Sequence, residues 1–554
     1  LNERCKIAIE KKHSFQDTGR SQQATTECAV VLAEEYRKYK EQLKSKIAKL
    51  GKNDKRLWQL NRELLNHKAK MSSIPPLRDE DGSWITDSKS KANLFASVWQ
   101  AKCSLPSEGN EPFHGKPELQ LDSFIAIRTR QVFHELSHLN CNKATGPDKI
   151  SAYILKELAG EIACPLAILA RRILYEGVWP EVWRIHHLVP IFKRNSSYLA
   201  KNYRGVHITS IVSKVVERCI GIPLIRHLQL HAFGENQWAF TKQRSARDLV
   251  ALYVSKWIFS LCTGHKVGFF MADISGAFDR VFKNYMMAKL LQAGVGDSHL
   301  QFLDSYLESR VGKVTCEGIV SDIFEIADTV FQGSVLGPAL WNCFFADVSF
   351  AATEKGGEAA LFADDLSIQH EFPASESNQR IFDNLKLSQE AIHKWGKRNR
   401  VSFDATKEKY VVIHFRHGEG DPFVLLGNHF DVKLHMDLAV QHVLNKNRPK
   451  ITAMLRTRGQ YGIKDMIMQY KTHIWGHAEY QNAAICHAVP SLLAQIDAMQ
   501  RRYLHELHLT EEVAFLDHNF LPPRTRRDVA MLGLIHKRVL GLSLIHISEP
   551  TRPY

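Results

Sequence analysis

Two adjacent carboxylates lie between short apolar runs in the stretch Leu361-Phe362-Ala363-Asp364-Asp365-Leu366-Ser367-Ile368. Apolar segments on both sides of a polar pair predict a tight hairpin, with Asp364 and Asp365 at its tip. Turns of this composition often join strands without any chemical role. The stretch alone therefore predicts structure, and chemistry requires partners from elsewhere in the chain.

A third carboxylate, Asp273, follows the apolar segment Val267–Met271. The segment predicts a short buried strand with Asp273 at its end, where a carboxylate can face a cleft, although Asp at such a place is also a common helix cap. Further on, a glycine-rich loop at Gln332–Pro338 feeds a helix and permits close approach of another chain. If the strand and the hairpin share a sheet, three carboxylates meet there and require divalent cations to neutralise them.

Two cations accompany a second predicted hairpin. The segment Trp183–Lys193 predicts a strand that ends in cations, and Asn202-Tyr203-Arg204 leads into another strand. Lys193 and Arg204 would then face one anion, such as a phosphate. Exposed cations beside strands are more often plain surface, so this pair alone does not establish a phosphate site.

A different metal site is suggested by His134-Glu135-Leu136-Ser137-His138, with Glu157 downstream. Two His four residues apart on a helix, with a Glu beside them, is the spacing of zinc proteases. In a chain with 27 His, this spacing can arise by chance, so it does not by itself establish a zinc site. The alternative is an ordinary surface helix whose apolar residues pack inward, namely Val132, Phe133, Leu136 and Leu139.

The composition limits the class of protein. In 554 residues, 44% are hydrophobic and 24% charged, which fits a globular protein of several domains. Lys and Arg number 73 against 59 Asp and Glu, so the net charge of +14 suits an anionic partner such as nucleic acid. The ten Cys include no Cys-x-x-Cys pair, so neither a zinc ribbon nor a disulfide framework is predicted. No apolar run reaches the roughly 18 residues of a membrane span.

The ends of the chain do not look like natural termini. The sequence begins with Leu1 and carries no signal peptide, which indicates a fragment of a longer product. Residues 543–554 resemble translated sequencing-adapter sequence and are excluded from the fold prediction.

Between these ends, the pattern predicts mainly helices. Residues 27–70 predict a basic helical linker with a break at Gly51–Asp54, and residues 104–120 predict a loop. Further helices are expected over Ser88–Cys103, Ser151–Leu158, Cys164–Tyr175, Ser213–Ile220 and Ile381–Asn399, and a strand over Tyr410–Phe415.

The order of strand, loop–helix and acidic hairpin is the layout of a polymerase palm, and the chain resembles the reverse transcriptases of non-LTR (LINE-type) retrotransposons. Six sequence blocks follow one another as in that family. They are Lys143–Asp148, Asn202–Arg204, Gln237–Phe240 with Arg244-Ser245, Asp273–Asp279, Gln332–Pro338 and Phe362–Asp365. The resemblance covers roughly residues 77–490.

The resemblance implies roles for individual residues. Asp273, Asp364 and Asp365 are the expected ligands of two Mg²⁺ ions, with Mn²⁺ as the alternative, in transfer of a deoxynucleotide from a dNTP to a primer 3′-hydroxyl. Phe278 matches the aromatic residue that blocks a ribose 2′-hydroxyl. Other expected nucleotide contacts are the bordering loop residues Gln332 and Gly333, the triphosphate-binding cations Arg204 and Lys193, and the basic residue Lys407.

The resemblance also implies an α+β fold shaped as a polymerase right hand, with fingers, a palm with an antiparallel sheet and a helical thumb, preceded by a helical N-terminal segment. Phe423–Gly427 resembles the primer-grip hairpin of that family. The expected divisions are a helical basic linker (1–76), an N-terminal extension leading into the fingers (77–172), fingers and palm (173–430), thumb (431–490) and a C-terminal helical region (491–542). The implied partners are an RNA template, a DNA primer and dNTPs, without a membrane, at an intracellular location. Target-site cleavage is not assigned, because no endonuclease sequence is found in the chain.

Several residues depart from the pattern of that family. Val330-Phe331 stands where Gly-Val-Pro is usual, Trp238 replaces a Phe-Gly pairing, Gly205 replaces Pro, and Lys149 replaces Gly. None of these changes removes an expected metal ligand. They leave open a second interpretation, a catalytically decayed remnant that binds nucleic acid without extending a primer.

Overall fold

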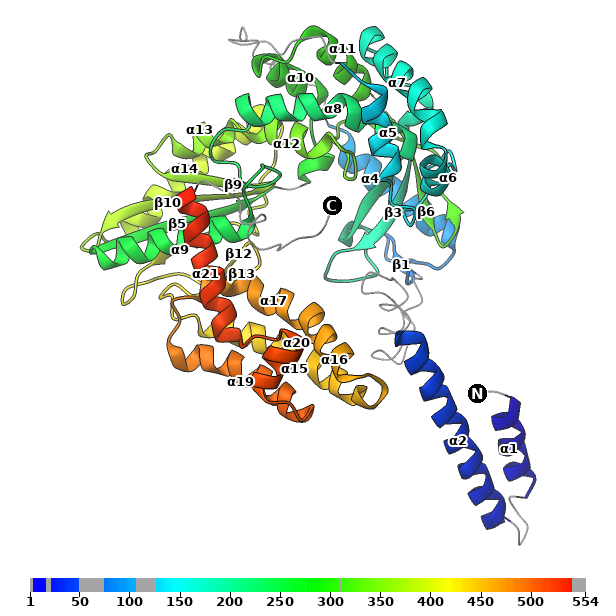
Figure 1. Cartoon of the computed structure of the whole chain (residues 1–554). Coiled ribbons are helices and arrows are strands. Elements are labelled where there is room, and N and C mark those ends of the chain that lie inside the picture. Colours follow the sequence, from blue (N-terminus) through cyan, green and yellow to red (C-terminus); the bar gives the residue numbers. More distant parts are fainter. Residues whose placement is uncertain are drawn as a thin grey trace. The chain divides into compact units, whose positions relative to one another are not determined.

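The computed structural model describes residues 3–15, 21–48, 74–105, 126–274, 276–308 and 310–540 (Figure 1). The chain divides into two compact units. One comprises Leu1–Met71 and His435–Leu532, and the other comprises Ser72–Leu434 and Gly533–Tyr554. The predicted break at Gly51–Asp54, most of the predicted loop over 104–120 and the segment 543–554 lie outside the described residues.

The larger unit contains a four-stranded antiparallel sheet in the order β11-β5-β10-β9. Helix α9 covers one face, where Trp257 Nε1 donates to Gln369 Oε1 at 3.0 Å, and α14 covers the other, where His370 Nε2 lies 3.1 Å from Ser388 Oγ (Figure 1). Burial on both faces explains the continuous apolar run of β5. The elements are β5 (His265–Asp273), β9 (Glu358–Phe362), β10 (Asp365–Pro373), β11 (Lys409–Ile413), α9 (Ala246–Cys262) and α14 (Asn378–Asn399).

A second sheet in the same unit has the order β4-β3-β6-β7, with β8 paired to β6. Strand β3 runs antiparallel to β4 but parallel to β6, which arrives more than a hundred residues later in the chain. Helix α4 packs on this sheet through Ala92, Phe95, Ala96 and Trp99, as the sequence predicts. The elements are α4 (Ser88–Cys103), β3 (Ile185–Phe192), β4 (Tyr203–Ile208), β6 (Arg310–Cys316), β7 (Ile319–Val320) and β8 (Phe324–Ile326).

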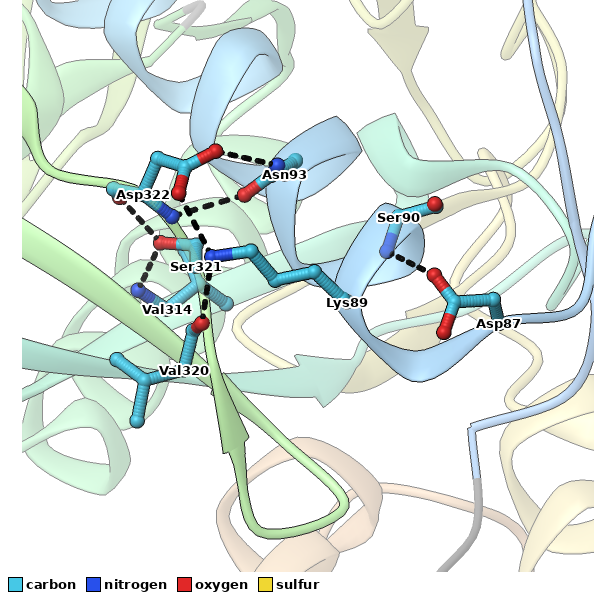
Figure 2. Close-up of polar contacts among 8 residues, drawn as sticks. All are labelled: Asp87, Lys89, Ser90, Asn93, Val314, Val320, Ser321 and Asp322. Atoms are coloured by element: carbon cyan, nitrogen blue, oxygen red, sulfur yellow. Dashed lines mark hydrogen bonds and ion pairs between the residues drawn. The ribbon is translucent and has the colours of Figure 1, made fainter.

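Polar contacts anchor the first half of α4 to the turn after β7 (Figure 2). Lys89 Nζ bonds the Asp322 carboxylate at 2.7 Å and the Val320 carbonyl at 3.1 Å. Asn93 donates to the Asp322 carboxylate and accepts from the Asp322 backbone, at 2.7 and 2.9 Å. Asp87 caps the helix by accepting from the Ser90 backbone N–H at 2.7 Å. These bonds keep α4 from sliding along its axis, and the apolar packing holds it against the sheet.

The remaining helices of this unit pack into one large core with the four-stranded sheet. Two predictions about them are wrong in detail. Phe133 points to solvent, 44% exposed, whereas Val132 and Leu136 are buried. The helix predicted to end at Ile220 continues through Pro223. The elements are α5 (Thr129–Ser137), α6 (Ala152–Glu157), α7 (Ala159–Glu176), α8 (Ile211–His231), α10 (Lys283–Gln292), α11 (Asp297–Tyr306), α12 (Gly337–Phe345) and α13 (Val348–Thr353).

Two short hairpins complete the larger unit. Strands β1 (Leu77–Arg78) and β2 (Trp84–Ile85) flank a turn at Asp79–Gly82. The predicted hairpin near Phe423 is formed by β12 (Phe423–Leu425) and β13 (Asn428–Phe430), with positive φ at both turn residues, Leu426 and Gly427. Positive φ at both positions gives the strands the twist of a type I′ turn.

In its described residues, the other unit has helices and no strands. Helices α1 and α2 are joined by ion pairs such as Lys11–Glu27 at 2.9 Å. No helix in the described ranges combines the length and apolar character that crossing a membrane requires. The longer elements are α1 (Glu3–Ser14), α2 (Ser21–Ala48), α15 (Asp437–Arg456), α16 (Ile463–Tyr470), α19 (Pro490–Glu506), α20 (Glu511–His518) and α21 (Pro523–Leu540), the last ending beyond this unit's boundary.

Candidate active site

Strand register brings the three predicted carboxylates to one end of the four-stranded sheet. In the β9–β10 pair, Asp365 lies opposite Phe362, which leaves Ala363 and Asp364 as a two-residue turn. In the β10–β5 pair, Asp365 lies opposite Asp273. The predicted tight hairpin is therefore confirmed, and Asp273 ends the strand beside it.

The turn is held by two side chains from other elements. Trp341 on α12 donates its indole N–H to the Ala363 carbonyl at 3.0 Å. Gln237 accepts through Oε1 from the backbone N–H groups of Ala363 and Ala239, at 3.2 and 3.0 Å. Ala363 needs this support because its φ is +58°, a left-handed conformation that costs a non-glycine residue about 1–3 kcal/mol.

The carboxylates repel one another. Burial, together with repulsion from Asp364 and Asp273, raises the pKa of Asp365 to about 7. Burial, and then Asp273, also raises the pKa of Asp364. Lys407 compensates part of this charge through ion pairs with Asp273 and, at 3.0 Å, with Asp404. The cluster thus carries negative charge that a cation would stabilise.

The donor set of this cluster fits a hard divalent cation that completes its coordination with other oxygens. Carboxylate oxygens are the ligands Mg²⁺ prefers, and Mg²⁺ is commonly held by one or two carboxylates together with water and substrate phosphates. In the part of the chain that the structure describes, no three His, Cys, Asp or Glu side chains form a group that could hold a metal ion by themselves. A cation at Asp273, Asp364 and Asp365 would therefore depend on oxygens from substrate or water.

The His134–His138 spacing has a different structural role. His138 is the C-cap of α5, where its Nδ1 lies 2.8 Å from the His134 carbonyl, and the two rings stack 4.2 Å apart. Glu135 forms a 2.9 Å ion pair with Arg218. Among the described residues, no three His, Cys, Asp or Glu side chains form a group that could hold a metal ion, and Glu157 is exposed on α6.

A cavity of about 1060 Å³ opens beside the carboxylates. All predicted site residues except Asp365 line it, so the structure gathers the expected metal ligands, nucleotide contacts and cations around one space. They share the wall with residues to which the sequence had given no role. The latter include Lys102, Arg194, Lys201, Phe240 and Asp279.

Phe278 forms a rigid part of the cavity wall. Its ring stacks on Trp341 with centroids 5.4 Å apart, and Phe240 meets it edge-on at 6.4 Å. Trp341 is fully buried and also holds the Ala363 turn. One indole therefore positions both the aromatic wall and the acidic turn.

The Gln332-Gly333 loop has a backbone that only glycine fits well. Gly333 has φ of +105°, and a Cβ there would lie 3.0 Å from the His207 carbonyl oxygen. The His207 N–H in turn donates to the Gln332 carbonyl at 3.3 Å. Strand β4, which carries Arg204, thus also supports the loop.

Glu217, another residue missed from sequence, fixes the start of α12. It is buried on α8, and its Oε1 accepts from the N–H groups of Val335 and Leu336 and from the Tyr306 hydroxyl, each at 2.8 Å. Burial raises the pKa of Glu217 above its ordinary value of 4.5, although these hydrogen bonds and Lys214 oppose the shift.

Glu217→Gln is expected to change how stability depends on pH. A carboxyl with a higher pKa in the folded state binds its proton more tightly when folded, so wild-type stability falls as pH rises from about 4.5 through the folded pKa. Glutamine keeps the acceptor oxygen and does not titrate. The difference in Tm, variant minus wild type, should therefore be larger by a few degrees at about pH 7.5 than at about pH 5.

Thermal unfolding of both proteins at the two pH values tests this, with the exposed Glu157→Gln as the matched control. A Tm difference between Glu217→Gln and wild type that stays constant across pH would contradict the assignment of a raised pKa to Glu217.

Two departures from the family pattern have local explanations. Gly205 faces Trp99 of α4, whose ring lies 3.1 Å from where a Cβ would be, so the small residue admits the helix. Lys149 has φ of +58°, a backbone conformation that glycine adopts without strain, which explains why glycine is the usual residue of the family at this position. Nearby, a Cβ on Gly146 would approach backbone atoms of Ser210 and Thr209 to 2.7 Å.

Comparisons with known proteins agree with these features. Residues 191–447 match the family described as "Reverse transcriptase (RNA-dependent DNA polymerase)". The chain is 24% identical over 431 residues to "RNA-directed DNA polymerase from mobile element jockey" of Drosophila melanogaster, covering 75% of this chain and 46% of that protein. It is 22% identical over 473 residues to "Probable RNA-directed DNA polymerase from transposon X-element" of Drosophila melanogaster, covering 80% and 51%.

A third relative gives a shorter match. "Retrovirus-related Pol polyprotein from type-1 retrotransposable element R1" of Bradysia coprophila is 26% identical over 306 residues, which covers 54% of this chain and 28% of that protein. The chain thus spans about half, or less, of the length of these relatives.

Proposed function

Because this chain carries a reverse transcriptase domain of the kind found in non-LTR retrotransposons, we propose that it is an RNA-directed DNA polymerase. It transfers deoxynucleotides from dNTPs to a primer 3′-hydroxyl, with Asp273, Asp364 and Asp365 holding two Mg²⁺ ions. The observation that carries the proposal is the register that sets Asp365 opposite Asp273, with Asp364 in the adjoining turn, beside a cavity lined by cations.

In this proposal the structural parts act as a polymerase right hand. The four-stranded sheet is the palm, the sheet β4-β3-β6-β7 with α4 belongs to the fingers, and the helices within residues 431–490 form the thumb. The net charge of +14 suits an RNA template and a DNA primer, whose phosphates would supply much of the binding energy.

The chain's own side chains bind and orient the nucleotide. Arg204 and Lys193 neutralise the triphosphate from the fingers side of the cavity, and burial lowers the pKa of Lys193. Phe278 excludes a ribose 2′-hydroxyl, and Gln332 and Gly333 border the nucleotide. When bound, the two ions would activate the primer hydroxyl and stabilise charge on the leaving pyrophosphate.

Lys407 has a separate task. Through its ion pair with Asp273 it keeps that carboxylate at the cavity, and an arriving cation and triphosphate would compete for both partners. Because Lys407 stays tethered to Asp404, it would remain beside the site after Asp273 exchanges partners.

Primer extension on an RNA template tests the proposed function. Full-length chain with dNTPs and Mg²⁺ is expected to extend an annealed DNA primer, and chelation of the ion should stop extension. Template–primer binding should weaken steeply as salt rises, because phosphate contacts release counterions. Salt-sensitive binding without incorporation under Mg²⁺ or Mn²⁺ would overturn the proposal and favour the decayed, nucleic-acid-binding remnant.

A further inference from the structure

The last turn of α4 reaches the cavity beside the carboxylates. Val98, Trp99, Ala101 and Lys102 all line that space. Helix α4 lies ahead of residues 191–447, the part of the chain that matches the reverse transcriptase family. A segment outside the matched domain therefore contributes a cation to the cavity.

The position of Lys102 is determined by the rest of its helix. At one end, Lys89 and Asn93 bond Asp322 (Figure 2). At the other end, the Cys103 carbonyl accepts from the Asp328 backbone N–H at 3.0 Å. With the helix fixed at both ends and packed on its sheet, the backbone of Lys102 is held beside the cavity.

Lys102 forms an ion pair with Asp279, the last residue of the block that begins with Asp273. The Lys102 side chain is 32% exposed and the Asp279 side chain 18%. An ammonium group has three donors, and the pair with Asp279 leaves donors for a second anion. Asp279 can therefore hold Lys102 in place while Lys102 binds a ligand in the cavity.

Lys102 is also part of a group of cations. Burial lowers the pKa of Lys193, and repulsion from Lys102 and Arg204 lowers it further, which places the three charges near one another. Arg194 and Lys201 line the same cavity. Asp279 compensates one of these charges, so this group of lining residues retains an excess of positive charge in the same cavity as the acidic turn. Such a surface is complementary to a compact polyanion.

We propose that Lys102 is a binding residue for the triphosphate of the incoming nucleotide, supplied to the cavity by α4 and held there by Asp279. This inference rests on the proposed polymerase function. The triphosphate is the ligand because Lys102 shares its cavity with Phe278 and the Gln332-Gly333 loop, which border the nucleotide in that function. Lysine binds phosphate as a point charge and needs no particular approach geometry.

The test measures single-nucleotide primer extension by the full chain at constant free Mg²⁺. Extension by wild type decides the proposed function first, so its failure cannot be mistaken for failure of the Lys102 assignment. Lys102→Met should then raise KM for dNTP roughly tenfold while kcat changes by less than about twofold, because a partly exposed charged hydrogen bond is lost. Lys102→Arg should restore most of the affinity.

The control is Lys386→Met. Lys386 is an exposed lysine on α14, takes no part in holding α4 and does not line the cavity, so its loss should leave KM for dNTP unchanged. Inorganic tripolyphosphate serves as a second probe, since it lacks base and sugar. Its inhibition constant should rise in Lys102→Met by the same factor as KM for dNTP.

An unchanged KM for dNTP in Lys102→Met would overturn the proposal. A decrease in kcat and in the amount of folded enzyme, with no change in KM for dNTP, would also overturn it. That result would mean that the Lys102–Asp279 ion pair stabilises the fold and does not bind the nucleotide. A rise in KM for the template–primer with no change for dNTP would also overturn it, and would assign Lys102 to a nucleic-acid phosphate instead.

Discussion

Asp364→Asn is expected to lower the rate of dNTP incorporation by roughly a thousandfold or more, since stabilisation of charge by a bound metal ion supplies several kcal/mol of the barrier reduction. Asparagine preserves the size of the side chain and the two-residue turn. It removes the negative charge that holds the cation, so the loss should lie in the chemical step and in metal affinity. Single-turnover incorporation at saturating dNTP, measured across Mg²⁺ concentrations, checks the prediction.

The control for Asp364→Asn is Asp383→Asn on the exposed face of α14, which removes a carboxylate far from the cavity's lining residues. It should extend primers at the wild-type rate. Template–primer binding should be similar in both variants. Wild-type incorporation by Asp364→Asn would refute the role of Asp364 as a metal ligand while leaving the family assignment intact.

Phe278→Ala is expected to make the enzyme accept ribonucleotides. The Phe278 ring is fixed between Trp341 and Phe240, so it cannot turn aside to admit a 2′-hydroxyl. Removing the ring opens space at that point, and the ratio of kcat/KM for rNTP to that for dNTP should rise by on the order of a hundredfold, the scale on which pocket shape discriminates small groups. Competing incorporation of matched rNTP and dNTP on one template measures the ratio.

Phe278→Tyr provides the matched comparison, because it keeps the ring and its stacking on Trp341. Discrimination against rNTP should persist in that variant. If Phe278→Ala retains wild-type discrimination, another part of the cavity excludes the 2′-hydroxyl, and Phe278 serves only to pack against Trp341.

Local sequence patterns predicted the elements whose structure depends on local periodicity. Helices α4 and α14 and the β9–β10 turn follow from apolar spacing and turn residues close together in the chain, whereas the β12–β13 hairpin was expected from the family resemblance. Phe133 was misplaced because it neighbours Val132, and a shift of one residue on a helix turns a side chain by about 100° away from the buried face.

The missed residues depend on contacts between distant segments. Lys102 and Asp279 are 177 residues apart, and Glu217 and Leu336 are 119 apart. No periodicity connects such pairs. Gln237 belonged to a recognised block, yet its bond to the Ala363 turn could not be inferred from that block, because it arises only when the chain brings residue 361 alongside it.

The docking of α4 has a consequence for folding during synthesis. Asn93 finds its partner Asp322 only 229 residues later in the chain. At about 5–20 residues per second, α4 emerges from the ribosome roughly 10–45 seconds before β6–β8, which complete the sheet beneath its apolar face. During that interval only β3 and β4 are available to cover Phe95 and Trp99. The nascent chain would thus be most vulnerable to aggregation before β6–β8 appear, and a chaperone that masks this helix would act in that window.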